Sequence, residues 1–498
     1  MRRYFPNFEE FADAAKSAQI VPVYRQLLAD RLTPVSAFEV LGREPHAFLL
    51  ESVVGGEKIG RYSFIAAGPK VVYQAAQGHA SIQQTGAARE FETTDPLADL
   101  QKLLPPARYH HDKHLPAFTG GLVGFAGYDT IRYYEGEKLP NPPKDDRRIP
   151  DVLFGLYGEL VIFDHVDKTI KVVANGDLSA GASADWAYRD ACRRIDQIIS
   201  RLSQPPLSAI GEIDPGAPLS LTYSTNCTAE QFEAMVAKGQ EYIRAGDIFQ
   251  FVPSQRLRVN SSADPFDVYR ALRIINPSPY MFYLKSPSCA LIGSSPEILC
   301  RVVGGTITHR PLAGTRRRGA DPDEDQRLER ELLADPKERA EHVMLVDLHR
   351  NDVGRVAKIG TVHISDVMTV ERYSHVMHIT SNVTGELADG FSALDALRVS
   401  LPVGTVSGAP KIRAMQIIDE LEPTRRGPYG GAVGYLDFAG NMDTCIALRT
   451  MVWRNGVFDV QAGAGVVADS VPRNEYEETM NKAKALLKAV EIAQSGFK

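Results

Sequence analysis

The chain is 498 residues long, 44% of them hydrophobic and 24% charged, and its formal net charge is −6. This length predicts two or three subdomains or one large interleaved domain, and the composition excludes an intrinsically disordered chain. The acidic balance gives no overall attraction to phosphate backbones, so a basic cluster could bind an anion only locally.

Neither disulfides nor a targeting segment is expected. The five cysteines are odd in number, scattered and without CxxC spacing, which argues against a disulfide framework and a zinc knuckle. The start, MRRYFPNFEEFADAAKS, lacks the apolar run of a signal peptide, and no segment approaches the roughly 20 apolar residues of a membrane helix. We therefore expect a soluble, cytoplasmic protein.

The first 202 residues contain short β-rich runs, such as FLLESVV and YGELVIFDHV, with a few helices between them. Residues 203–220 (SQPPLSAIGEIDPGAPLS) are rich in Pro, Gly and Ser and indicate a linker. From 221 to 498 strands and helices alternate, and the glycine-bounded strands favour antiparallel hairpins. The sequence predicts a mixed α+β fold, with one domain over 1–202 and a second over 221–498.

Residues 310–319 read RPLAGTRRRG, a small-residue turn that is surrounded by four arginines. Such a turn could hold phosphate, nucleic acid, a small carboxylate or only water. The residues of the turn alone do not decide between these four possibilities.

Three helix starts are well marked in the C-terminal part of the chain. Asp335 and Pro336, followed by Glu338, predict an N-cap, a first-turn proline and a capping-box acid. A second helix is expected from Pro410. The last is expected over 474–493, where apolar residues recur at alternating four- and three-residue steps.

Two of these helices carry a glutamate pair in their first turns, Glu338 with Glu341 and Glu475 with Glu478. The i, i+3 spacing places both carboxylates of a pair on one helical face. Two such faces opposite each other could present oxygen ligands to Mg²⁺. From spacing alone, a solvated acidic first turn that favours the helix dipole is the commoner explanation.

Two glycine-containing turns and a histidine pair are weaker signals. LPVGTVSGAPK (401–411), with Lys411 nearby, and QAGAGVVADS (461–470) offer backbone amides to an anion, but neither has Walker A or dinucleotide-fingerprint spacing. His375 and His378 lack a third nearby zinc ligand, and either could be an acid/base group or a half-buried strand histidine.

Taken together and in order, these segments resemble the chorismate-binding enzymes. This superfamily includes anthranilate synthase component I, aminodeoxychorismate synthase component I, and the isochorismate and salicylate synthases. The segments that carry the resemblance are SSPEILCR, RPLAGTRRRG, DPKERAEHVMLVDLHRNDVGR, YSHVMHITSNVTGEL, LPVGTVSGAPK, YGGAVGY, DTCIALRT and QAGAGVVADSVPRNEYEET. LLESVVGGEKIGRYSFI and FTGGLVGFAGYD resemble the amino-terminal domain of the first two members. The resemblance implies a large mixed fold of sandwiched antiparallel sheets flanked by helices.

The resemblance also assigns roles to individual positions. Chorismate is a dicarboxylate, for which arginines, helix N-termini and glycine amides are suitable partners. The residues implied to line its pocket are Gly314, Thr315, Tyr429, Arg449, Gly463 and Gly465. The residues implied to bind Mg²⁺ are Glu338, Glu341, Glu475 and Glu478. The implied catalytic residues are Glu297 as the acid that protonates the departing C4 hydroxyl, His378 in the later loss of pyruvate, Thr405 and Gln250.

Two positions separate the branches of the family. Members that add water carry a lysine base at the position of Gln250, and a glutamine has no titratable proton, so an ammonia nucleophile is favoured. Members that aminate C4 typically carry a lysine at the position of Ala313, where its amine can attack the substrate ring. These positions favour direct addition of ammonia at C2 and formation of anthranilate. The alternative is the folate branch, which forms 4-amino-4-deoxychorismate.

Partners follow from the same resemblance. No GxSxG elbow or Cys-His glutaminase pattern is present, so ammonia is expected from a separate glutamine amidotransferase subunit, in a hetero-oligomer of two large and two small subunits. LLES and NPSPYM look like the family's tryptophan feedback site, which would make 1–202 a regulatory domain, although NPSPY alone could be a proline turn. The residues implied there are Leu50, Glu51, Ser52, Pro279, Tyr280 and Met281.

A different class of function would be a non-catalytic, nucleic-acid-binding protein that uses Arg316–Arg318. The acidic net charge and the absence of interleaved aromatic residues argue against it. We expect neither a nucleic acid nor a membrane as a partner.

Overall fold

The computed structural model describes residues 3–28, 30–53, 60–84, 86–104, 108–205, 211–372 and 376–497. Its helices are α1 (Phe8–Ala14), α2 (Pro34–Leu41), α4 (Pro96–Leu103), α5 (Arg132–Glu135), α6 (Ala184–Leu202), α7 (Ala229–Arg244), α8 (Pro265–Ile275), α9 (Pro322–Ala334), α10 (Pro336–Gly354), α11 (Ala393–Ser400), α12 (Lys411–Leu421) and α13 (Pro472–Gln494), with short 3₁₀ turns at Tyr128–Ile131 and Gly136–Lys138.

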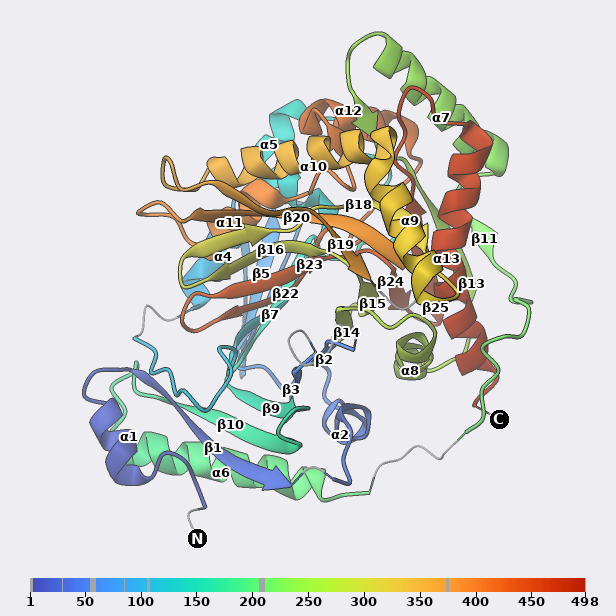
Figure 1. Ribbon diagram of the computed structural model, residues 1–498. Coiled ribbons are helices and arrows are strands. Elements are labelled where there is room, and N and C mark those ends of the chain that lie inside the picture. Colours follow the sequence, from blue (N-terminus) through green and yellow to red (C-terminus); the bar gives the residue numbers. More distant parts are fainter. Residues whose placement is uncertain are drawn as a thin grey trace.

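Two large antiparallel sheets form the body of the molecule (Figure 1). The first contains, in spatial order, β1 (Ile20–Leu28), β10 (Thr169–Asp177), β9 (Glu159–Asp164), β3 (Tyr62–Ala67), β2 (Ala47–Glu51), β14 (Tyr280–Lys285), β15 (Ala290–Ser295), β24 (Thr450–Arg454), β25 (Val457–Gly463), β13 (Ser254–Asn260) and β11 (Ser224–Thr225).

The second sheet contains, in spatial order, β18 (Leu312–Arg317), β20 (Val376–Glu386), β17 (Thr306–His309), β16 (Ile298–Val303), β23 (Met442–Ile446), β22 (Ala432–Asp437), β7 (Gly121–Ala126), β8 (Val152–Tyr157), β4 (Val71–Ala76), β5 (His79–Gln84) and β6 (Ala87–Glu92), with β19 (His363–Arg372) on β20. The short strands β12 (Gln250–Phe251) and β21 (Gly408–Ala409) pair separately.

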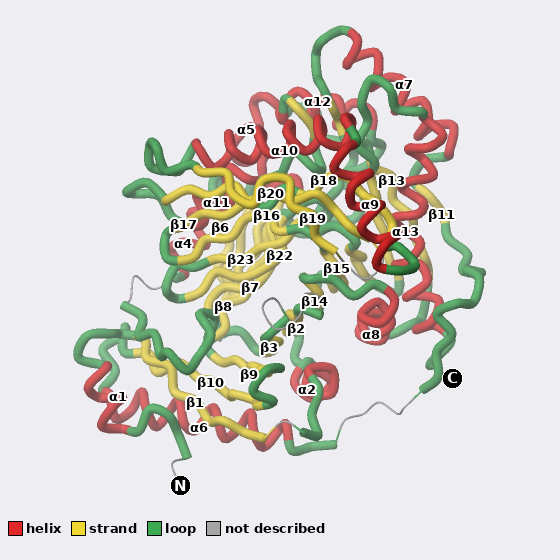
Figure 2. Tube along the Cα trace, in the orientation of Figure 1, coloured by secondary structure: helices red, strands yellow, loops and turns green. Residues whose placement is uncertain are grey.

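The side chains of each sheet alternate between two cores. In β10, Val172 and Ala174 face the helices outside the first sheet, whereas Val173 faces the second sheet. In β7, Val123 lies in this shared core and Leu122 faces the helices on the other side. Figure 2 shows the result, with helices outside two layers of strands. This period-two pattern buries both faces of each sheet, and it confirms the predicted fold of sandwiched antiparallel sheets flanked by helices.

Both sheets run across the expected linker. β2 pairs with β14, and β7 pairs with β22, so strands from before residue 203 and after residue 220 share the same ladders. The assignment of regulatory and catalytic roles to 1–202 and 221–498 stays a prediction, but the two parts share their hydrophobic cores. No helix within the described ranges is long and apolar enough to cross a membrane.

The predicted helix starts are confirmed, with one correction. Asp335 caps α10 by accepting hydrogen bonds from the amides of Lys337 and Glu338. Glu338 does not complete a capping box, because its carboxylate accepts from Arg316 instead. Helix α12 begins at Lys411 with Pro410 as its N-cap residue, and α13 begins at Pro472, two residues before the predicted start at 474.

Candidate active site

Glu297 lies in the short connection between β15 and β16 and is only 5% exposed. Burial raises the pKa of Glu297 to about 8, against the opposing effects of neighbouring Thr405 and Lys482. The Oε1 atom of Glu297 and the hydroxyl of Thr405 are buried and have no hydrogen-bond partner within the described ranges. A protonated carboxyl at neutral pH can give a proton to a bound molecule.

His378 on β20 faces the turn that contains Gly314 and Thr315. Its Nδ1 atom lies 2.9 Å from the carbonyl oxygen of Gly314 and 3.1 Å from the hydroxyl of Thr315. A bulge between Ala313 and Arg316 interrupts the pairing of β18 with β20 and turns this carbonyl toward the histidine. Burial lowers the pKa of His378, with Arg449 contributing in the same direction, so the imidazole is neutral near pH 7. His375, by contrast, lies outside the described residues.

Arg449 has a positive φ of 47° and is held by a hydrogen bond from the Ser294 amide to its own carbonyl. Burial lowers the pKa of Arg449, and Tyr429 and Glu478 are its neighbours. No hydrogen bond or ion pair of its guanidinium occurs within the part of the chain that the structure describes. A half-buried guanidinium without a partner suits a carboxylate of a bound molecule.

Two glycines let the backbone approach the same region closely. A Cβ on Gly463 would lie 2.8 Å from the carbonyl oxygen of Pro253 and 3.0 Å from the hydroxyl of Tyr429. A Cβ on Gly465 would lie 2.7 Å from the Nε2 atom of Gln250. The Oε1 atom of Gln250 is buried and without a partner among the described residues, so its amide is available to a ligand.

The two predicted glutamate pairs lie in the first two turns of α10 and α13 and influence each other, with only Glu338 and Glu475 in the first turn itself. Burial raises the pKa of Glu341, and the charges of Glu338 and Glu478 add to this effect. The pKa of Glu475 is also raised, because burial and the charge of Glu478 together exceed the effects of neighbouring groups that lower it. Glu338 and Glu478 are bonded to cations, at 3.0 Å from Arg316 and 2.6 Å from Lys482. Within the described ranges, no three acidic, histidine or cysteine side chains are gathered into a metal-binding group.

Lys482 was not predicted from the sequence. It follows Glu478 by one turn of α13, and its ammonium donates to the carbonyl oxygen of Gly463 at 3.0 Å. It lines a pocket of about 360 Å³ with Arg449 and Glu478. The i, i+3, i+7 spacing of Glu475, Glu478 and Lys482 places all three on one helical face, which is the signal that could have found it.

The arginines of RPLAGTRRRG do not form a free basic patch. Each is paired with a carboxylate: Arg310 with Glu371, Arg316 with Asp335 and Glu338, Arg317 with Glu324, and Arg318 with Asp325. Lys411, expected near an anion cradle, is similarly bonded to Asp352 at 2.9 Å. The basic residues of these two turns therefore form ion pairs with other residues of the same chain.

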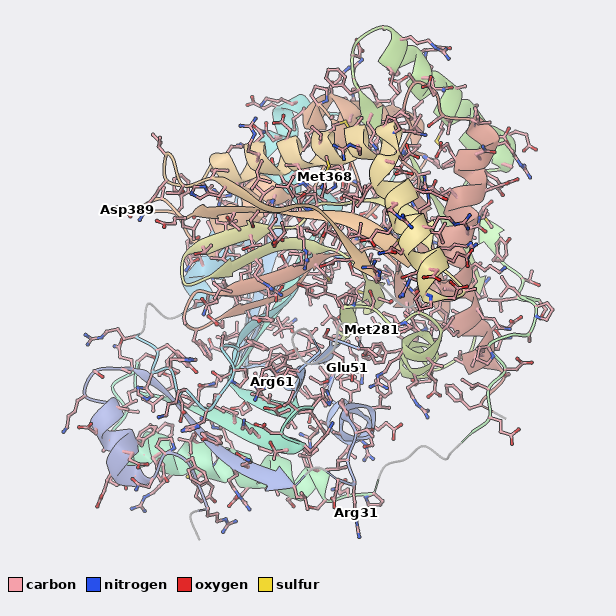
Figure 3. All side chains as sticks on the ribbon, viewed as in Figure 1. Arg31, Glu51, Arg61, Met281, Met368 and Asp389 are labelled. Carbon is pink, nitrogen blue, oxygen red and sulfur yellow. The ribbon has the colours of Figure 1, made fainter. Side chains whose placement is uncertain are left out.

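The six residues predicted for a regulatory site border one cavity of about 320 Å³ between the two sheets. Glu51 and Met281 are register partners on β2 and β14 and are labelled in Figure 3. Tyr280 donates to Asp443 at 2.9 Å, and this carboxylate also accepts from Arg301. Phe118 and Tyr435, also on the lining, stack with ring centroids 4.0 Å apart.

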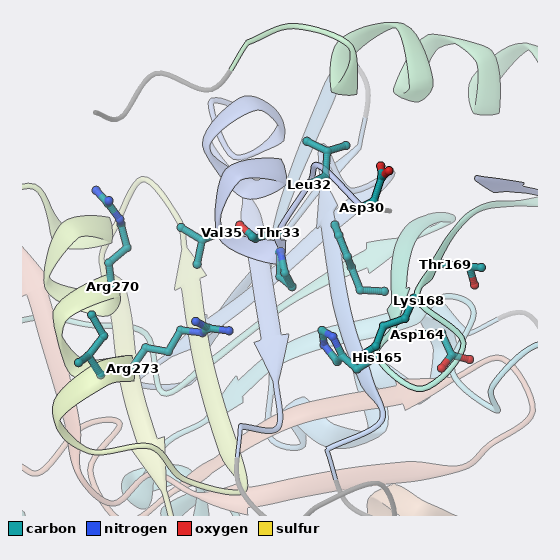
Figure 4. A pocket seen from close by; sticks show the side chains of 13 residues that line it. Asp30, Leu32, Thr33, Val35, Asp164, His165, Lys168, Thr169, Arg270 and Arg273 are labelled. Atoms are coloured by element: carbon teal, nitrogen blue, oxygen red, sulfur yellow. The ribbon is translucent and has the colours of Figure 1, made fainter. Parts of the chain in front are cut away.

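Glu51 points to the helix side of the first sheet, as does its register partner Met281. Its carboxylate accepts from the hydroxyl of Tyr269 at 2.6 Å and from the Nε atom of Arg273 at 3.0 Å, both on α8. Arg273 in turn lines a groove of about 730 Å³ between α2, the β9–β10 turn and α8 (Figure 4). The Glu51 carboxylate is thus already engaged on the helix side of the first sheet.

The chain matches the model of the chorismate binding enzyme family over residues 45–488. It is 47% identical to anthranilate synthase component 1 of Acetivibrio thermocellus, over 98% of this chain and 99% of that protein. The corresponding protein of Pseudomonas aeruginosa is 46% identical, with the same coverage.

Two solved structures are also similar. Anthranilate synthase component I from Streptococcus pneumoniae TIGR4 is 37% identical and superposes with a TM-score of 0.76, covering 93% of this chain and 99% of that one. The menaquinone-specific isochorismate synthase MenF of Escherichia coli, at 19% identity, has a TM-score of 0.70 over 97% of this chain and 98% of that one, which shows a shared fold.

Proposed function

Because the chain belongs to the chorismate binding enzyme family, we propose that it converts chorismate and ammonia to anthranilate, pyruvate and water, a lyase reaction that commits chorismate to tryptophan biosynthesis. The observation that carries the proposal is the combination in one region of a buried protonated acid, Glu297, and a neutral base, His378, with a glutamine in place of a basic residue at 250. The near-full-length likeness to anthranilate synthases supports it.

We assign the binding of chorismate to side chains that lack hydrogen-bond partners among the described residues and to backbone groups that face the pocket. Arg449 would bind one carboxylate of the substrate, with Tyr429 and the amides around Gly463 and Gly465 on the same wall. Gly314 and Thr315 lie against His378, which is also close to Arg449, and they are assigned to the same pocket. The substrate ring is proposed to bind where both Glu297 and His378 can act on it.

In the first step ammonia attacks C2, the ring double bond shifts, and the C4 hydroxyl leaves as water. Glu297 gives the proton that this leaving group needs, which its pKa of about 8 permits at neutral pH. Thr405 lies beside this carboxyl, and Gln250 offers an uncharged amide where a base would instead activate water.

In the second step the amino intermediate loses its C2 proton, and the enolpyruvyl group departs as pyruvate after gaining a proton on its methylene carbon. We assign acceptance of the C2 proton to His378, and the assignment is supported by its neutral ring and by the contact of its Nδ1 atom with the carbonyl of Gly314. Aromatisation of the ring drives this elimination.

We propose Mg²⁺ as the cofactor, with Glu338, Glu341, Glu475 and Glu478 as the carboxylates that would hold it. The donor set fits, because hard carboxylate oxygens suit Mg²⁺, and because the pKa values of Glu341 and Glu475 are raised by burial and, to a smaller extent, by the charges of neighbouring glutamates, which a cation would offset. When bound, the ion would supply Lewis-acid stabilisation to the substrate carboxylate. Mg²⁺ should raise the melting temperature of the chain, and Glu341→Gln should reduce this shift.

The ammonia source is proposed to be a separate glutamine amidotransferase subunit, in an assembly of two large and two small subunits. Burial raises the pKa of every cysteine thiol in the chain, to about 11 for Cys192 and Cys227 and to about 12 for Cys300. Cys289 and Cys445 shift in the same direction. Such thiols are poor nucleophiles, so none suits glutamine hydrolysis. The free cysteines also favour the cytoplasm as the compartment.

Feedback inhibition by tryptophan is proposed at the cavity between the sheets. Its volume of about 320 Å³ and its lining of Leu50, Phe64, Pro279 and Tyr280 suit an indole ring. Ser52 and Asp443 supply polar groups beside it.

The test is direct. The purified chain, supplied with chorismate, Mg²⁺ and ammonium, should produce anthranilate fluorescence, and glutamine should replace ammonium only when the partner subunit is added. Turnover of chorismate to a non-fluorescent amino product would instead assign the chain to the 4-amino-4-deoxychorismate branch.

A further inference from the structure

Behind the candidate pocket lies a buried ion pair, Arg426 with Glu422. The side chains are 1% and 2% exposed, with Nη2 of Arg426 2.5 Å from Oε1 of Glu422 and Nε 3.0 Å from Oε2. A buried ion pair is costly to desolvate and is by itself weak evidence for stability. The role of the Arg426–Glu422 pair is therefore inferred from its hydrogen bonds to other segments.

Arg426 donates to two backbone carbonyls that belong to separate pocket segments. Its Nη1 atom lies 2.6 Å from the carbonyl oxygen of Val406, the residue after Thr405. Its Nη2 atom lies 2.6 Å from the carbonyl oxygen of Val252, two residues after Gln250. One guanidinium thus ties together the segments that present Thr405 and Gln250.

Glu422 extends the connection to the glycine wall. Its Oε1 atom accepts from the amide and the hydroxyl of Ser254 at 2.7 and 2.8 Å. The Ser254 hydroxyl accepts in turn from Gln461 at 2.8 Å, and Ser254 is the register partner of Gly463. The carboxylate therefore sets the position of β13 against β25 where β25 reaches the pocket.

The guanidinium also lies near two tyrosine rings. Its Cζ atom is 4.6 Å from the ring centroid of Tyr128 and 5.8 Å from that of Tyr429. Tyr429 is the residue whose hydroxyl lies against Gly463. Four pocket elements, the 250–254 and 405–406 segments, Tyr429 and the 461–463 segment, therefore meet at one ion pair.

We propose that Arg426 and Glu422 are positioning residues for the reaction, which set Thr405, Gln250, Tyr429 and Gly463 at their places around the substrate. Neither touches the reacting atoms. This inference rests on the proposed function, because its main readout is turnover. The planar fork of arginine is essential to it, since a lysine ammonium is a point charge that cannot hold both carbonyls and both carboxylate oxygens.

The experiment compares Arg426→Lys with a matched control, Arg132→Lys. Arg132 makes a similar bidentate pair with Asp419 of α12, at 2.6 and 2.9 Å, and its other hydrogen bonds within the described ranges go to Asp129 and Leu139, outside the pocket segments. Both variants should lose similar thermal stability. Only Arg426→Lys should lose kcat, by about 100-fold with ammonium, because displacing catalytic groups by about 1 Å costs that much. Its KM for chorismate should rise by less than kcat falls.

Ser254→Ala provides a second test that leaves the ion pair itself intact. It removes the hydrogen bond that the Ser254 hydroxyl donates to Glu422 and the one that it accepts from Gln461, so the melting temperature should fall moderately, and kcat should fall by roughly fivefold to tenfold. If the parent chain turns over chorismate but Arg426→Lys matches Arg132→Lys in kcat, or Ser254→Ala leaves kcat unchanged, the positioning role is overturned. If the parent chain itself is inactive, the proposed function fails instead.

Discussion

The Nδ1 atom of His378 lies 2.9 Å from the carbonyl oxygen of Gly314, and this contact determines the tautomer of the imidazole. A carbonyl oxygen can only accept, so in the neutral ring Nδ1 carries the proton and Nε2 carries the lone pair. Because burial keeps the ring neutral near pH 7, His378 is equipped to accept a proton.

Replacing His378 with Met should therefore separate the two steps of the reaction. The base for the second step is lost, whereas Glu297 still serves the first, so the amino intermediate should accumulate while anthranilate formation falls by at least about 100-fold. Chromatography with mass detection of a quenched reaction would reveal the intermediate. Normal anthranilate output from this variant would remove His378 from the mechanism.

The pH dependence of kcat/KM should follow Glu297. Its folded-state pKa of about 8 lies above the ordinary 4.5, so the acid stays protonated at neutral pH and is lost as the pH rises through 8. With free ammonia held constant, activity should decline above that pH, and Glu297→Gln should lower it by about 100-fold or more.

The same shift has a consequence for stability. Between about pH 4.5 and about pH 8, the interval between its unfolded and folded pKa values, Glu297 is ionised in the unfolded chain but stays protonated in the fold, so the free energy of unfolding falls progressively as the pH rises through this interval. The melting temperature of Glu297→Gln, relative to that of the parent chain, should therefore rise as the pH increases across this interval. A difference that does not change with pH would contradict the assignment.

Gly465→Ala should impair catalysis without unfolding the chain. The added Cβ would lie 2.7 Å from the Gln250 amide and displace it, so kcat/KM for chorismate should fall by roughly tenfold to 100-fold. Gly136→Ala is the control, because no atom of the described residues lies within 4 Å of its Cβ position and its φ of −58° is ordinary for alanine. Equal kinetics for the two variants would show that Gln250 does not need its present place.

Ala313→Lys tests the branch assignment. Ala313 is buried at the β18 bulge beside His378, so a lysine amine there would compete with ammonia for the ring. Anthranilate formation should fall by at least about 100-fold, and intact-mass analysis should detect a covalent adduct with chorismate. Unchanged anthranilate formation would mean that position 313 does not face the substrate.

Leu50→Trp should relieve feedback inhibition. The larger side chain would fill part of the cavity of about 320 Å³ that is proposed for tryptophan, while the candidate active site is left untouched. Inhibition by tryptophan should weaken by at least about tenfold at near-normal uninhibited activity. Leu28→Trp, at a position 76% exposed, is the control and should remain fully sensitive.

The sequence predicted the local structure well, since caps and apolar periodicity are local signals. Asp335, Pro410 and the 474–493 pattern mark real helix starts. It did not predict that both sheets run across residues 203–220, because pairs such as β2 with β14 are set by tertiary packing. A linker-like composition marks an exposed connection and does not by itself separate two cores.

Within the candidate site, residue types were easier to predict than their partners. The four arginines of RPLAGTRRRG suggested an anion site, but their acidic partners come from α9, α10 and β19 and were not readable from the turn. Lys482 and the Arg426–Glu422 pair could not be predicted from the sequence for the same reason, since their roles depend on contacts with Gly463 and Val252 from distant segments.

The central claim is that this chain places ammonia on C2 and releases pyruvate. The most direct measurement is a reaction with ¹⁵N-ammonium, chorismate and Mg²⁺, followed by NMR of the aminated product and a coupled assay of pyruvate. The account predicts ¹⁵N on the aromatic ring of anthranilate and one pyruvate for each anthranilate. A ¹⁵N label on C4 of a non-aromatic product, with no pyruvate released, would contradict it.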